Sequence, residues 1–152
     1  MTTIRDYLPT DLEKTAAVWL TSTIKGQPFL SEEYWLKVYR SIYHTLLPDR
    51  WQTFVAEVDG EIEGMLSLCA PGVISALFVG PSCQRKGHAS ALLETVKARF
   101  DRLEVSVYIQ NEHALSFFEK NGFVPLRQEI EAETRLKQQL YVWTRSSDGL
   151  TV

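Results

Sequence analysis

The stretch VISALFVGPSCQRKGHASALLETVK, residues 73–97, passes from an apolar run to a helix-like run through a loop with two glycines and a basic pair. Residues 73–79 are almost continuously apolar, which predicts a strand buried on both faces of a sheet. From His88 onward apolar residues recur at three- and four-residue steps, which predicts a helix. An alternating strand at 103–109 follows, and a crossover helix allows only parallel or splayed pairing with it. The segment therefore predicts a mixed sheet covered by helices.

The loop between this strand and this helix has the features of an anion site. A helix that starts near His88 leaves its first amides without intrahelical partners, and these amides and the helix dipole attract negative charge. Gly87 allows a close backbone approach or a positive φ, while Arg85 and Lys86 add local positive charge. The spelling fits neither a Walker A loop nor a three-glycine dinucleotide loop. A diphosphate suits these donors best, and the alternative is an ordinary solvated basic loop.

The rest of the chain predicts further helices and strands. A capping box at Thr10–Glu13 opens one helix, and Ser31 caps a second that ends near Pro48. Asp59–Gly60 is a strong signal for the type I′ turn of a β-hairpin, and Asn121–Gly122 for the end of a helix. The predicted order is β-α-α-β-β-β-α-β-α-β-β, with the remaining strands at 3–7, 54–58, 62–68, 123–130 and 139–144 and a helix at 112–120.

Composition excludes several classes of protein. The 152 residues predict one domain spanning positions 1–152, and a net charge of −3 argues against a nucleic-acid or anionic-membrane partner. No apolar run approaches the ~20 residues that cross a bilayer. Cys69 and Cys83 form no metal-binding pattern, and the N-terminus does not resemble a signal peptide. We expect a cytoplasmic protein without a bound metal, as a monomer or homodimer.

Two motifs resemble those of the GNAT N-acetyltransferase family. Residues 84–89, QRKGHA, are similar to its acyl-CoA pyrophosphate motif, Gln/Arg-x-x-Gly-x-Gly/Ala. Residues 111–123, NEHALSFFEKNGF, look like its second motif, N-x-x-A-x-x-F-Y-x-x-x-G-F. The two motifs stand in the family's order and separation, and the predicted strand and helix order matches the family over nearly the whole chain.

The resemblance implies the α/β GNAT fold, a mixed central sheet with splayed parallel strands flanked by helices, and acetyl-CoA as cosubstrate. It implies direct attack on the thioester, in a ternary complex, by a primary amine of a lysine, a protein N-terminus or a small molecule. A backbone amide within 77–79 would stabilise the oxyanion. The residues expected to bind the cofactor are Leu77, Phe78, Val79, Gln84, Arg85, Lys86, Gly87, His88, Ala89, Asn111, Phe117, Phe118 and Lys120.

One position departs from the family pattern. The Tyr of the second motif commonly protonates the leaving thiolate, and this chain has Phe118 there, which has no proton to give. Another group or a water molecule could serve instead, or the chain could be a non-catalytic acyl-CoA-binding or sensing module. We expect an active enzyme, because the loss of one general acid costs only ~10²–10⁴-fold in rate. The candidate catalytic residues are Tyr108, Tyr141, Glu57 and His113.

The sequence also supports predictions for side chains outside the candidate catalytic set. Cys83 lies within the pyrophosphate loop, which argues against an acyl-cysteine intermediate. Tyr34, Trp35, Tyr39 and Tyr43 recur at helical spacing and are expected to lie mostly in the core. Since the first two helices of the family usually form the acceptor wall, some of these rings are also expected to shape the acceptor pocket.

Overall fold

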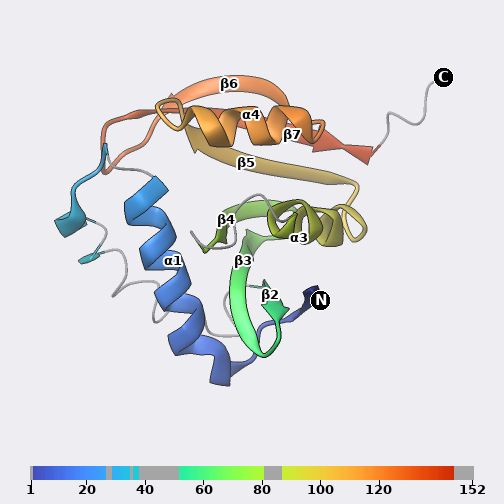
Figure 1. Ribbon diagram of the computed structural model, residues 1–152. Helices are drawn as coiled ribbons and strands as arrows, with labels where there is room; N and C mark the ends of the chain where they lie inside the picture. The colour runs from blue at the N-terminus through green and yellow to red at the C-terminus, as the bar shows by residue number, and fades with distance from the viewer. Residues whose placement is uncertain (1, 27–28, 35, 38–51, 81–86, 146–152) are drawn as a thin grey trace.

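The computed structural model describes residues 2–26, 29–34, 36–37, 52–80 and 87–145, and these form a seven-stranded mixed sheet with helices (Figure 1). The strand order is β1-β2-β3-β4-β5-β7-β6, and β4 and β5 are the parallel pair. The strands are β1 Thr2–Asp6, β2 Gln52–Val58, β3 Glu61–Ala70, β4 Val73–Val79, β5 Arg102–Tyr108, β6 Val124–Ile130 and β7 Lys137–Thr144. The helices are α1 Leu12–Gly26, after a 3₁₀ turn at Pro9–Asp11, α3 His88–Lys97 and α4 Glu112–Lys120.

Most of the predicted elements are confirmed. Asp59 and Gly60 have φ values of 50° and 83°, as the predicted type I′ turn between β2 and β3 requires. Gly122, with φ 90°, follows the end of α4. Residues 32–34 and 36–37 are helical, and the Ser31 hydroxyl accepts a hydrogen bond of 3.0 Å from the Tyr34 amide, as a capping residue does. The predicted end of that helix near Pro48 lies outside the described residues.

The start of α1 differs from the prediction. The chain enters it through a 3₁₀ turn, and the Asp11 carboxylate accepts a hydrogen bond of 2.8 Å from the Leu8 amide. Arg5 of β1 holds this carboxylate with two further bonds of 2.8 and 3.0 Å. Asp11, not the predicted Thr10–Glu13 box, therefore caps the turn, because the ion pair with β1 fixes its side chain there.

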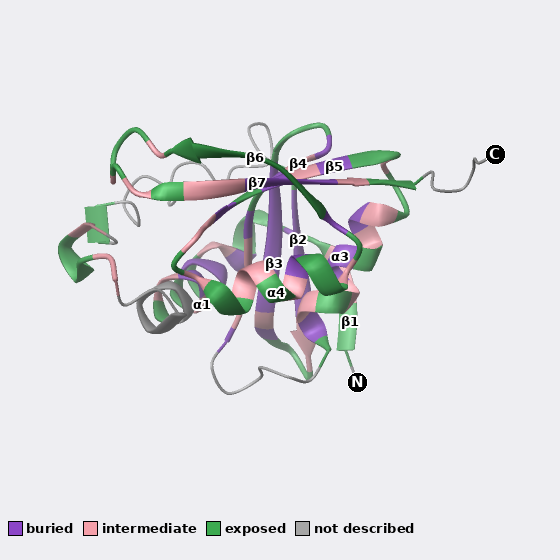
Figure 2. Ribbon diagram, turned by 90° about the horizontal axis from the view of Figure 1, so that it is seen from above, coloured by how far each residue is buried: buried purple, intermediate pink, exposed green. Residues whose placement is uncertain are grey.

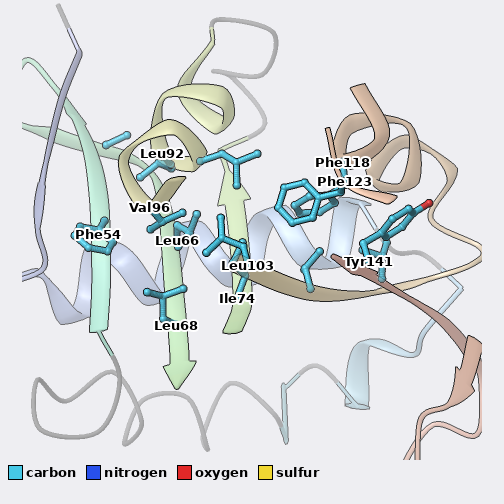
Figure 3. Packing of buried hydrophobic residues seen from close by; sticks show 14 residues of the cluster. Phe54, Leu66, Leu68, Ile74, Leu92, Val96, Leu103, Phe118, Phe123 and Tyr141 are labelled. Carbon is cyan, nitrogen blue, oxygen red and sulfur yellow. The ribbon is translucent and has the colours of Figure 1, made fainter. Parts of the chain in front are cut away.

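Apolar side chains pack on both faces of the sheet. On one face, α1 contributes Trp19, which packs with Val55, Met65 and Ala76. On the other face, α3 and α4 cover a larger cluster, which Figure 3 shows with Leu92 and Val96 on one side and Phe118, Phe123 and Tyr141 on the other. Figure 2 shows burial concentrated along the central strands, whereas β6 is exposed throughout. The central strands are therefore held from both sides.

The parallel pair is short, and β4 is irregular. Its register comprises Val73 with Glu104 and Ile74 with Val105, after which β4 and β5 diverge (Figure 1). A bulge in the β3–β4 ladder leaves Ser75 opposite no residue of β3 and exposed. Residues 77–79 are only partly buried. The prediction of a strand buried on both faces is therefore wrong for the second half of β4, because β5 no longer covers that edge.

Replacing Asp11 by asparagine tests the cap that joins β1 to α1. The hydrogen bonds from Arg5 lower the pKa of Asp11, although burial opposes the shift. Because the folded pKa is depressed, the stabilisation is present above the unfolded pKa of ~3.9 and is lost as pH falls through the folded pKa. Asp11→Asn should therefore lower the free energy of unfolding by about 1–3 kcal/mol at neutral pH and by less in acid, as measured by urea denaturation.

Asp101→Asn is the matched control for this variant. Asp101 pairs with Arg145 at 2.9 Å, but its side chain is 94% exposed. An exposed pair contributes at most ~1 kcal/mol, so this variant should lose no more than that and less than Asp11→Asn. Equal losses in the two variants would contradict the role assigned to Asp11.

Candidate functional site

The divergence of β4 and β5 leaves one edge of β4 without a neighbouring strand. Its other edge continues to pair with β3, with Leu66 opposite Leu77 and Met65 opposite Phe78. Among the described residues, the β4–β5 register does not extend past Ile74. Main-chain groups of β4 beyond that point therefore face the space between the two strands, where they can bind an extended ligand.

The N-terminus of α3 begins beside the end of β4. Gly87 is its N-cap, with φ 83° and no side-chain cap, so the predicted positive φ is confirmed. The first helical bond joins the Ala91 amide to the Gly87 carbonyl at 3.0 Å, which leaves the preceding amides of α3 outside the helical ladder. The expected pyrophosphate residues Gln84, Arg85 and Lys86 lie outside the described residues.

The two side chains that follow Gly87 are buried or partly buried. His88 is 5% exposed, and its Nδ1 lies 3.2 Å from the Thr2 hydroxyl of β1. Ala89 is partly buried. These two expected cofactor-binding residues can therefore offer main-chain amides to an anion, while the His88 ring serves the packing of α3 on β1.

The second motif lies on α4, at the other side of the divergence. Asn111 is the N-cap of α4, and its side-chain oxygen accepts a hydrogen bond of 3.2 Å from the Ala114 amide. Phe117 is partly buried and Lys120 is exposed. Phe118 is 5% exposed and contacts Phe117. It also contacts two further aromatic rings, which Figure 3 shows beside it. These rings are Phe123, with a centroid distance of 5.2 Å, and Tyr141, with 6.5 Å.

Three of the candidate catalytic residues form their contacts away from the space between the diverging strands β4 and β5. Glu57 of β2 accepts a hydrogen bond of 2.6 Å from Arg5 Nε, next to the outer strand β1. Tyr141 donates to Glu119 at 2.7 Å, and burial, with this bond, raises its pKa to about 12. His113 is exposed in the first turn of α4. The structure does not bring these three side chains together.

Tyr108, the fourth candidate, ends β5 inside a cluster of aromatic and hydroxyl groups. The Phe29 ring meets it edge-on, with centroids 5.8 Å apart and planes at 77°. The Thr134 hydroxyl donates a hydrogen bond of 3.4 Å to the Tyr108 oxygen. Tyr34 also forms a hydrogen bond with Tyr108. Of the aromatic residues predicted at helical spacing, Tyr34 joins this cluster, while Trp35, Tyr39 and Tyr43 have side chains outside the described residues.

A surface hollow of about 310 Å³ lies elsewhere on the molecule. It is lined by the start of β2, the end of β3 and the loop before β5, including Leu68, Cys69 and Phe100. These residues lie at the end of the sheet where β4 and β5 pair, opposite to the end where they diverge. The hollow therefore has no part in the site formed by the two motifs.

Comparison with known proteins decides the family. A family model described as the acetyltransferase (GNAT) domain matches residues 21–137. The chain belongs to the GNAT acetyltransferase family. Peptidyl-lysine N-acetyltransferase YiaC of Escherichia coli (strain K12) is 30% identical over 140 residues, which are 92% of this chain and 95% of YiaC. Peptidyl-lysine N-acetyltransferase YjaB of the same organism is 30% identical over 122 residues, 78% of this chain and 80% of YjaB.

Solved structures of GNAT proteins share the fold. The solution structure of apo-form YjaB from Escherichia coli superposes with a TM-score of 0.83 at 23% identity, covering 94% of this chain and 97% of that one. PaiA N-acetyltransferase from Thermoplasma acidophilum, in complex with coenzyme A, gives 0.79 at 21% identity, covering 95% and 99%. The predicted GNAT fold and the predicted N-acetyltransferase class are thereby confirmed. Within the described part of the chain, no helix is long and apolar enough to span a membrane.

Proposed function

We propose that this N-acetyltransferase transfers the acetyl group of acetyl-CoA to the side-chain amine of a protein lysine. The observation that carries the proposal is the divergence of β4 and β5 next to the uncapped N-terminus of α3. The names of YiaC and YjaB, both peptidyl-lysine N-acetyltransferases, support the acceptor. The coenzyme A complex of the PaiA enzyme supports the donor.

The two ends of the coenzyme are assigned to two backbone features. The first amides of α3, at Gly87–Ala89, take the pyrophosphate with the basic loop before them, since they carry the positive end of the helix dipole. The pantetheine arm lies along the open edge of β4 at Leu77–Val79, with Asn111 and Phe117 at the start and middle of α4 on its other side. The thioester is thus placed between the diverging strands.

The reaction then needs few groups from the protein. A neutral amine attacks the thioester carbon, and a backbone amide within residues 77–79 stabilises the oxyanion that forms. Collapse of this intermediate breaks the carbon–sulfur bond and leaves a thiolate, which takes a proton. Phe118 occupies the family's usual tyrosine position and has no proton, so the donor must be another group. The exposed thiol of Cys69 suits a reducing compartment, so we place the reaction in the cytoplasm.

Turnover can be measured as the release of coenzyme A thiol from acetyl-CoA. A lysine-containing peptide should release thiol and gain one acetyl group on its ε-amine, which mass spectrometry locates. A peptide whose one amine is its N-terminus, and a small polyamine, serve as alternative acceptors. If no amine releases thiol while the protein binds coenzyme A, the chain is an acyl-CoA-binding module and the proposed reaction is wrong.

Gly87→Ala tests the pyrophosphate site. Both Gly87 and Gly60 have φ 83°, and an added Cβ would meet nothing within 4 Å at either position. The cost of alanine is therefore backbone strain of about 1–2 kcal/mol at each. At Gly87 the relief of strain rotates the first amides of α3, so coenzyme A affinity measured by calorimetry should fall about tenfold.

Gly60→Ala is the matched control, because it places the same strain in the β2–β3 turn. It should lower stability to a similar extent and leave coenzyme A affinity within about twofold of the unaltered chain. Unchanged affinity in Gly87→Ala, or an equal loss in both variants, would contradict the pyrophosphate assignment.

A further inference from the structure

We propose that Tyr108, supported by Tyr34, gives the leaving thiolate of coenzyme A its proton. The proposal rests on the proposed acetyl-CoA-dependent function and names the group that supplies what Phe118 lacks. Tyr108 comes from β5, Tyr34 from the helical segment after Ser31, and a third hydroxyl, that of Thr134, from the turn before β7. The three hydroxyls thus come from three separate parts of the chain.

The strand register sets Tyr108 level with the proposed position of the thioester. Val73 pairs with Glu104, and four residues beyond this pair the two strands reach Leu77 and Tyr108. The bulge at Ser75 changes this level by one residue at most. Tyr108 therefore lies across the divergence from the segment of β4 whose main chain is proposed to hold the acyl group.

The alternation of β5 directs the Tyr108 side chain to the face that α3 and α4 do not cover. Leu103, Val105 and Val107 belong to the cluster under those two helices. Since successive side chains of a strand point to opposite faces, Tyr108 points the other way. An acyl-CoA gripped at the N-terminus of α3 and threaded between β4 and β5 presents its sulfur to that side.

The hydrogen bonds around Tyr108 leave its own proton available for a ligand. Thr134 donates to the Tyr108 oxygen. The hydrogen bond with Tyr108 also contributes to raising the pKa of Tyr34. Because the Tyr108 oxygen accepts from Thr134, its own O–H can donate to another acceptor, and the edge-on Phe29 ring fixes the plane of the phenol.

Burial and nearby negative charges raise the pKa of Tyr34, the hydrogen-bonding partner of Tyr108. Burial first, then the charge of Tyr108 and its hydrogen bond, then the charges of Glu131 and Glu133, raise the pKa of Tyr34. Glu131 is held in place by the amides of Glu133 and Thr134 at 3.0 and 2.7 Å. Glu133 in turn pairs with Lys37 at 3.3 Å. Tyr34 is therefore protonated at neutral pH and stays a hydrogen-bonding partner of Tyr108.

The proton transfers balance without another reactant. The amine nitrogen forms a bond to the thioester carbon, and the carbonyl electron pair moves to oxygen. As that pair returns, the carbon–sulfur bond breaks, its electrons go to sulfur, and Tyr108 O–H gives its proton to sulfur. The surplus proton on nitrogen then passes to the Tyr108 phenolate. An amide and coenzyme A thiol result, and Tyr108 is restored.

Tyr108→Phe removes the proposed donor with little change in shape. With acetyl-CoA and the lysine peptide, kcat should fall by about 10²-fold, while KM for acetyl-CoA stays within about twofold. Tyr34→Phe, which removes the hydroxyl that is hydrogen-bonded to Tyr108, should lose less than Tyr108→Phe. Tyr141→Phe is the control, because that hydroxyl is already bonded to Glu119, and it should keep kcat within about threefold.

A second acetyl donor distinguishes a role of Tyr108 in proton supply from a merely structural role. S-phenyl thioacetate releases a more acidic thiol, whose thiolate leaves without protonation, so Tyr108→Phe should lose less than about threefold in kcat/KM with it. An equal loss with both donors, or unchanged kcat with acetyl-CoA, overturns the proposal. Absence of turnover in the unaltered enzyme would instead refute the proposed function, so the two failures are distinct.

Discussion

The short parallel contact between β4 and β5 is the constraint on which the site depends. It joins two antiparallel halves of the sheet, β1-β2-β3-β4 and β5-β7-β6, through two residue pairs at one end. Because strands twist relative to their neighbours, a contact confined to one end lets the other ends separate. The separated ends are the carboxyl end of β4, whose edge is uncovered and which α3 follows along the chain, and the carboxyl end of β5, which is Tyr108. A longer ladder would pair that edge and close the site.

Local signals in the sequence predicted those parts of the fold that local backbone chemistry decides. Asp59–Gly60 and Gly87 have the positive φ values that their residue types indicate, since glycine and aspartate adopt this conformation at low cost. The cap of α1 was not predictable in this way. It depends on Arg5, which lies on a strand and reaches Asp11 only after β1 has paired with β2. Likewise, apolar residues in β4 predict burial, but the bulge at Ser75 and the separation from β5 leave half of it open.

The same distinction applies to the candidate site. The two motifs identified the loop and α4 because each motif is contiguous and its resemblance to the family is specific. The hydroxyl cluster is not contiguous, since Tyr34, Tyr108 and Thr134 come from three elements far apart in the chain. Helical spacing drew attention to Tyr34, and alternation to Tyr108, but no pattern in the sequence links them or points to Thr134. Glu57 was a catalytic candidate from the sequence, but in the structure it pairs with Arg5 of another strand, a contact that the local sequence does not indicate.

The packing of Phe118 is consistent with a proton donor on β5 in this chain, whereas the family usually has its donor on α4. Phe118 packs among Phe117, Phe123 and Tyr141 at 5% exposure, where a phenol without an acceptor would cost about 1–3 kcal/mol. A phenyl ring at this position therefore favours the core. Polar partners for a phenol stand instead around the end of β5, where Thr134 and Tyr34 hold Tyr108. With Tyr108 as the proton donor, position 118 on α4 needs no ionisable side chain, and an apolar ring can occupy it for packing alone.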